Sequence, residues 1–160
     1  MNNTILYLIG NTAAARLAVA REIAALTSAR IVDSQDIYAP IFNLLESPKP
    51  ADVPDAAWAQ VDAVRAAILK TIETLSPRDW NFVFTHAGID IPADVGVYRS
   101  VRNMAKRRGA RFLPVTLTGA KVQRLLTFDE ADALAVDMTA LPPADAAKRI
   151  VAAAQTATSS

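Results

Sequence analysis

The sequence contains no cysteine and a single histidine, His86, among its 160 residues. Disulfide bonds, thiolate nucleophiles and cysteine metal sites are therefore excluded, and one histidine cannot form a histidine metal cluster. We expect no metal site of these kinds. The lack of cysteine also fits a reducing compartment, so we expect a cytoplasmic location.

The chain also lacks a charge excess and a long apolar run. Its formal net charge is +1, from 17 basic and 16 acidic residues, which gives no overall attraction to nucleic acid or to an anionic membrane. The apolar segment at residues 1–9 is too short to span a bilayer and lacks the basic start of a signal peptide. We expect neither nucleic-acid nor membrane partners, whereas a homo-oligomer stays open.

Strand-like and helix-like periodicities alternate along the chain. Strands are predicted at residues 5–9, 30–33, 81–86, 111–117 and 134–138, and helices at 14–27, 34–45, 55–75, 93–108 and 142–154. This alternation predicts a three-layer α/β/α fold with a five-stranded, mostly parallel sheet. We expect a single domain over residues 1–154 and a flexible C-terminal tail at 155–160.

Polar segments follow three of the predicted strands, at residues 10–16, 33–36 and 86–90. Ligands of such sheets bind at the carboxyl ends of the strands, so these segments are the candidate site. The first has the outline of a phosphate-binding loop, G-x-x-x-x-G-K-[ST]. Its candidate cofactor-binding residues are Gly10, Asn11, Thr12, Ala13, Ala14, Ala15, Arg16 and Leu17.

This outline extends along nearly the whole chain. The sequence resembles the P-loop small-molecule kinases, a group around shikimate kinases, nucleoside-monophosphate-like kinases and antibiotic phosphotransferases, at residues 5–17, 31–37, 82–86, 112–117 and 135–147. The resemblance implies a P-loop NTPase-like fold that binds ATP at the loop. It also implies an aspartate after the second strand that binds substrate or positions Mg²⁺. Asp33 matches that aspartate, and Asp36 is its neighbour.

The loop departs from the family motif at three positions. Ala15, Arg16 and Leu17 replace the second glycine, the lysine and the hydroxyl residue. Leu17 offers no oxygen to Mg²⁺, and the planar guanidinium of Arg16 is not equivalent to an ammonium group. We therefore expect ATP binding to be weak at best and Mg²⁺ not to be held by the loop. The connection at 118–133, where these kinases carry an arginine-bearing lid, is long enough only for a short helix.

Two interpretations stay open for the other site residues. In a phosphotransferase, Asp33 and Arg16 would be catalytic, and the substrate would be bound by Asp33, Asp36, His86, Arg99 and Arg102. The plainer interpretation is structural: the two aspartates cap and solvate the start of a helix, and the histidine is a hydrogen-bonded strand end. Likewise, the first loop could be a simple strand-to-helix turn capped by Asn11 or Thr12.

Basic residues gather in and after the helix predicted at 93–108. The simplest interpretation is a solvated helix face whose last-turn cations complement the helix dipole, and the alternative is a phosphate site at Arg99 and Arg102. The cluster consists of Arg99, Arg102, Lys106, Arg107, Arg108 and Arg111.

These observations predict a P-loop kinase-like protein related to ATP-dependent small-molecule phosphotransferases, with weak or lost phosphoryl transfer. The alternative is a non-catalytic binding or assembly module that keeps the P-loop architecture. In either case we expect a small-molecule or phosphate-bearing ligand. The sequence leaves open whether the protein is an enzyme.

Overall fold

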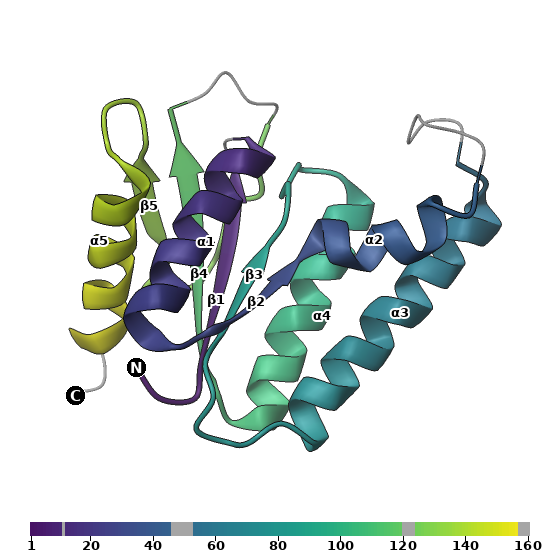
Figure 1. Ribbon diagram of the computed structural model, residues 1–160, viewed down its shortest axis with the longest axis horizontal. Helices are drawn as coiled ribbons and strands as arrows, with labels where there is room; N and C mark the ends of the chain where they lie inside the picture. Colours follow the sequence, from purple (N-terminus) through teal and green to yellow (C-terminus); the bar gives the residue numbers. More distant parts are fainter. Residues whose placement is uncertain (11, 46–52, 120–123, 157–160) are drawn as a thin grey trace.

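A computed structural model describes residues 1–10, 12–45, 53–119 and 124–156. Strands and helices alternate along the chain, as predicted (Figure 1). In chain order the elements are β1 Thr4–Gly10, α1 Ala13–Thr27, β2 Arg30–Asp33, α2 Ser34–Phe42, α3 Asp55–Thr74, β3 Phe82–Thr85, α4 Pro92–Arg108, β4 Arg111–Thr118, β5 Leu134–Asp137 and α5 Pro143–Thr156.

The five strands form one sheet in the order β2-β3-β1-β4-β5, and all neighbouring strands are parallel. This confirms the predicted α/β class with a five-stranded sheet. β1 occupies the centre, where Leu8 lies opposite Thr85 of β3 and Val115 of β4. Because the strands are parallel, their carboxyl ends, and the polar segments that follow them, meet at one edge of the sheet.

Helices cover both faces of the sheet. β1 is therefore buried along its whole length, and its side chains alternate between two cores. Leu6 and Leu8 pack in the core formed with α1 and α5. Ile5, Tyr7 and Ile9 pack in the core formed with α3 and α4. Figure 1 shows α1 and α5 on one side of the sheet and α3 and α4 on the other. Among the helices that the structure describes, none combines the length and apolar character needed to cross a bilayer.

Several boundaries differ from the sequence prediction. α2 contains Pro40 and ends at Phe42, three residues before the predicted end at residue 45. α5 continues through Thr156, so the first two residues of the predicted tail are helical. The rest of the tail, residues 157–160, lies outside the described residues. In the connection between β4 and β5, residues 124–133 are not helical, which corrects the expected short helix for that part.

The solvated-face interpretation of the basic cluster is wrong for Arg108. This side chain is only 3% exposed and donates hydrogen bonds to the carbonyl oxygens of Ile72, Ser76 and Pro77 and to Asn3 Oδ1. The last carbonyls of a helix have no partner within the helix, so Arg108 on α4 caps the end of α3.

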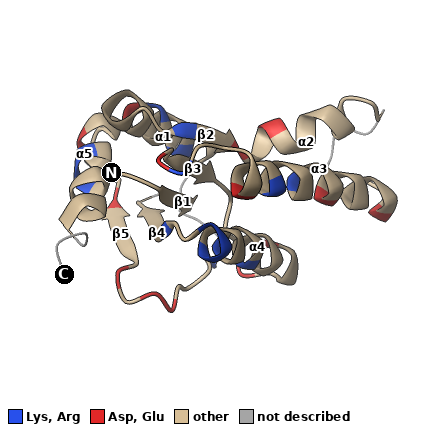
Figure 2. Ribbon diagram, turned by 90° about the horizontal axis from the view of Figure 1, so that it is seen from below, with Lys and Arg blue, Asp and Glu red and all other residues tan. Residues whose placement is uncertain are grey.

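A second member of the cluster has a similar structural role. Arg111 of β4 donates to the carbonyl oxygens of Ala153 and Ala154 in the last turn of α5, and it pairs with Asp132 at 3.2 Å. The exposed Arg107 pairs with Glu73 of α3. Figure 2 shows basic residues spread over several helices and interleaved with acidic ones. Much of the basic cluster therefore holds helices together.

Candidate ligand-binding site at the carboxyl ends of the strands

β1 ends at Gly10, and the packing there requires glycine. Its φ of +82° lies in the left-handed region, which disfavours side chains. A Cβ at this position would lie 2.4 Å from the carbonyl oxygen of Leu117 and 3.0 Å from Cδ1 of Leu125. The amide of Gly10 donates to the carbonyl oxygen of Ala87 at 3.2 Å. The glycine of the expected loop thus has a structural function whether or not a phosphate binds.

The helix after Gly10 begins earlier than a phosphate-binding loop allows. The motif needs four loop residues between its glycines, so that backbone N–H groups can surround a phosphate. Here α1 begins at Ala13, with Thr12 as its N-cap. The amide of Ala15 donates to Thr12 Oγ1 at 3.1 Å, and the amide of Arg16 donates to the Thr12 carbonyl oxygen at 3.0 Å. Two amides of the expected cradle are therefore bound within the protein. Asn11 lies outside the described residues.

Arg16 points back toward the strand rather than into solvent. Its Nη1 donates to the carbonyl oxygen of Gly10 at 2.9 Å, and the residue is only 8% exposed. Burial lowers the pKa of Arg16, and the charge of Asp33 acts in the opposite direction. Leu17 beside it is half-buried and has no polar side-chain atom. The described residues of the loop, 10 and 12–17, therefore do not fit the phosphates of a Mg²⁺-ATP complex.

Asp33 and Asp36 take the structural positions expected of helix-start residues. Asp33 is the N-cap of α2, and its Oδ1 accepts from the amide of Gln35 at 2.9 Å. Asp36 is exposed in the first turn, where a negative charge complements the helix dipole. Across the described residues, no three His, Asp or Glu side chains converge on a point that could hold a metal ion.

His86 is buried after β3 and has polar partners on both ring nitrogens. Its Nδ1 accepts from the amide of Gly88 at 3.2 Å, and Asp94 Oδ2 lies 3.6 Å from the same nitrogen. The hydroxyl of Tyr38 lies 3.2 Å from Nε2. Because Nδ1 accepts, the proton of the neutral ring is on Nε2 and is donated to Tyr38. Burial lowers the pKa of His86 to about 4, while Asp94 acts in the opposite direction.

The structure gathers Arg16, Asp33 and His86 where strands β1, β2 and β3 end. The charge of Arg16 influences His86, and the charge of Asp33 influences Arg16. Arg102 instead pairs with Glu130 of the β4–β5 connection at 2.6 Å. Arg99 is exposed on α4. The predicted substrate-binding set is thus divided between this edge and the surface of α4.

Four residues of the site were missed by the sequence prediction. Tyr7, Tyr38, Arg65 and Asp94 surround His86 or share a cavity with it. Tyr7 alone gave a usable signal, since a hydroxyl in the middle of a buried strand needs a partner. The others lie on three different helices, and nothing in their local sequence indicates that these helices converge.

The described part of the β4–β5 connection closes against the loop before α4. Ile89 and Leu125 form an antiparallel bridge, and the amide of Asp90 donates to the carbonyl oxygen of Arg124 at 2.8 Å. The side chains of Arg124 and Asp90 also pair at 2.8 Å. The segment that replaces the expected lid is therefore extended here, and its Leu125 packs against Gly10.

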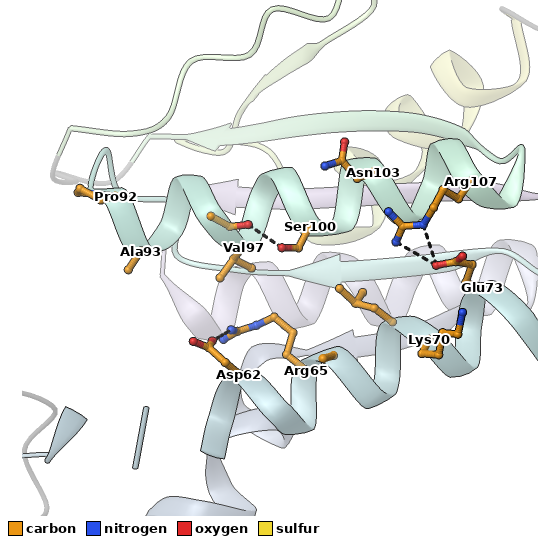
Figure 3. A pocket seen from close by; sticks show the side chains of 13 residues that line it. Asp62, Arg65, Lys70, Glu73, Pro92, Ala93, Val97, Ser100, Asn103 and Arg107 are labelled. Atoms are coloured by element: carbon orange, nitrogen blue, oxygen red, sulfur yellow. Dashed lines mark hydrogen bonds and ion pairs between the residues drawn. The ribbon is translucent and has the colours of Figure 1, made fainter. Parts of the chain in front are cut away.

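A groove of about 590 Å³ runs between α3 and α4 (Figure 3). Arg65 bonds to Asp62 near one end, and Arg107 bonds to Glu73 near the other. A groove of this size could accommodate a small organic ligand. It adjoins the strand ends because Arg65 also lines the cavity beside His86.

Several solved kinases share this fold. A gluconokinase from Sinorhizobium meliloti 1021 superposes with a TM-score of 0.64 and 15% identity, covering 98% of this chain and 94% of that one. A shikimate kinase from Aquifex aeolicus gives 0.57 and 13%, covering 98% and 99%. A shikimate kinase from Acinetobacter baumannii, solved in complex with shikimate, gives 0.57 and 13%, covering 98% and 96%.

The protein therefore has the fold of the P-loop small-molecule kinases, which confirms the resemblance stated from the sequence. The sequence itself matches no family model and no curated relative. At identities this low the likeness establishes the fold alone, so the chemistry must be argued from the site residues.

Proposed function

We propose that this protein is a kinase-like binding protein whose phosphoryl transfer is weak or lost. The observation that carries the proposal is the buried guanidinium of Arg16, bonded to the carbonyl oxygen of Gly10. In this position Arg16 fixes the turn between β1 and α1. Because α1 begins at Ala13, the turn held by this hydrogen bond caps a helix and is not shaped to bind a triphosphate.

ATP is bound weakly in this account, through the N-terminus of α1 and its dipole. Mg²⁺ contributes little, because Leu17 stands where a hydroxyl ligand is needed and metal bridging of the phosphates is central to the reaction. The acceptor side of the site, near Asp33 and His86, keeps polar groups that suit a small hydroxylated or phosphate-bearing ligand.

The groove between α3 and α4 favours a second candidate, a non-catalytic binding module. It offers charged and polar groups of both signs along its length, including Lys70, Glu73 and Asn103. A ligand seated there would depend neither on Arg16 nor on Asp33. Substitutions in the groove would then change binding while substitutions at the strand ends would not.

An assay of ATP turnover tests the proposal. The purified protein is incubated with ATP, Mg²⁺ and a panel of sugars, sugar acids and shikimate, and ADP is measured. We expect no more ADP from the wild type than from Asp33→Asn, because both would report only background. Turnover that requires Mg²⁺ and disappears in Asp33→Asn would show an active phosphotransferase and overturn the proposal.

A further inference from the structure

A small, partly enclosed cavity lies beneath the strand ends, between the sheet and helices α2, α3 and α4. It has room for about one water-sized particle. Its polar lining includes Tyr7 from the central strand, His86 from the end of β3 and Arg65 from α3. Tyr7 is 1% exposed and Arg65 is 9% exposed, so both are removed from solvent.

Two polar atoms of these lining residues lack a hydrogen-bond partner. Within the described parts of the chain, neither the hydroxyl of Tyr7 nor Nε of Arg65 is hydrogen-bonded. The neighbouring His86 differs, because both of its ring nitrogens have partners. Buried polar groups nearly always have a hydrogen-bond partner. Two unpaired groups on residues that line one cavity therefore indicate a bound particle that accepts a hydrogen bond from both.

Both orphaned groups can donate a hydrogen bond. Arg65 Nε is a donor only, and the Tyr7 hydroxyl keeps its proton because burial raises the pKa of this phenol. Arg65 and Arg16 place positive charge near His86 beside the cavity, and Asp94 places negative charge there. The counter-ion of Arg65 is Asp62, whose side chain is 70% exposed and therefore screened by water.

We propose that this cavity binds one small monovalent anion, of the size of chloride or bromide, between the Tyr7 hydroxyl and the Arg65 Nε–H group. The anion accepts a hydrogen bond from each donor and offsets the buried charge of Arg65. Sulfate and phosphate are too large for the cavity. The site is distinct from the Gly10 turn, so it does not depend on the proposed loss of phosphoryl transfer.

Halide-dependent thermal stability tests the proposal in solution. A ligand that binds only the folded state raises Tm, and at ten times its dissociation constant one halide ion should raise Tm by roughly 3–6 °C. General salt effects act equally on wild type and variants. The informative quantity is therefore the difference between wild type and Tyr7→Phe as bromide or chloride is titrated.

We expect the wild type to gain stability with either halide and Tyr7→Phe to lose most of that gain. Without halide, Tyr7→Phe should be at least as stable as the wild type, because an unsatisfied buried hydroxyl has been removed. Tyr98→Phe is the matched control, since the hydroxyl of Tyr98 bonds to Glu130 away from the cavity. It should keep the full halide response. An equal response in wild type and Tyr7→Phe, or no response in either, would overturn the proposal.

Crystals grown in bromide give an independent result. We expect anomalous scattering from one bromide ion between Tyr7 and Arg65. An ordered water without anomalous signal would show that the cavity is a solvent site and would overturn the proposal. A bromide peak without the wild-type gain in Tm would also overturn it, because binding would then occur at crystal concentrations only.

Discussion

Nη1 of Arg16 donates to the carbonyl oxygen of Gly10 at 2.9 Å, across the turn that joins the central strand to the first helix. In the loop motif of P-loop kinases a lysine at this position reaches toward phosphates. Here the guanidinium of Arg16 binds the backbone of the protein itself, and the residue is buried. The charge expected for ATP binding is therefore present in the sequence but serves to hold the turn.

Gly10 and Gly96 provide a matched pair of substitutions. Gly10→Ala should lower the free energy of unfolding by more than about 2 kcal/mol, because the new Cβ meets the Leu117 carbonyl oxygen in a left-handed conformation. Gly96→Ala should instead raise it by about 0.5–1 kcal/mol, since Gly96 lies inside α4 with open space around it. Urea unfolding of both variants measures these changes. A neutral Gly10→Ala variant would contradict the packing described at the end of β1.

Arg108 should be the most important basic residue of α4 for stability. Arg108→Ala removes hydrogen bonds to three carbonyl oxygens and to Asn3, so it should cost about 2–4 kcal/mol. Lys106→Ala, an exposed neighbour in the same last turn, should change stability by less than about 0.5 kcal/mol. Equal effects in urea unfolding would mean that the cap on α3 is not formed.

The protein should lose stability as pH falls from about 6.5 to about 4. The folded pKa of His86 is lowered to about 4, whereas an unfolded histidine titrates near 6.5. Between these values the unfolded chain binds the proton and the folded protein does not, so acid favours unfolding, by roughly 2–3 kcal/mol in total.

His86 is the sole histidine, so His86→Gln isolates its contribution. In urea unfolding between pH 6.5 and 5, above the range where most carboxylates titrate, the wild type should lose stability and His86→Gln should change much less. NMR of the imidazole should show a neutral ring throughout this range. Titration of His86 near pH 6.5 in the folded protein would contradict its burial.

Repair of the loop motif should not by itself restore nucleotide binding. The triple variant Ala15→Gly, Arg16→Lys and Leu17→Ser restores the missing residue types. It leaves the Thr12 cap that starts α1 at Ala13. We expect an affinity gain below tenfold, which is about 1.4 kcal/mol.

Adding Thr12→Gly and Ala13→Gly to the triple variant should increase the gain, because the first turn of α1 can then open. Calorimetry with ATP compares the two variants. A tenfold gain in the triple variant alone would show that only the chemistry of the loop, and not its shape, had changed.

The architecture was predictable because burial leaves a direct pattern in the sequence. The apolar run at residues 5–9 indicated a strand covered on both faces, and β1 has no exposed residue. The helices at 55–75 and 93–108 followed from apolar residues spaced three and four apart. The helix predicted at 93–108 ends at Arg108, and Gly109 follows it with a φ of +67°.

The site was less predictable, because its properties depend on contacts between distant segments. Nothing in the local sequence shows that Arg16 bonds to Gly10 or that Arg108 reaches the end of α3. Arg65 resembles any basic residue of an amphipathic helix, yet it is 9% exposed beside Tyr7 and His86. An arginine is expected at the surface by default, and only the packed structure shows which ones are buried.

Titration calorimetry of the wild-type protein with ATP, with and without Mg²⁺, tests the central claim that the phosphate cradle is closed by Arg16 and the first turn of α1. The account predicts a dissociation constant in the high micromolar range or weaker, nearly unchanged by Mg²⁺, because the Ala15 and Arg16 amides are bound to Thr12 and Leu17 offers no metal ligand. A dissociation constant in the low micromolar range that requires Mg²⁺ would contradict it.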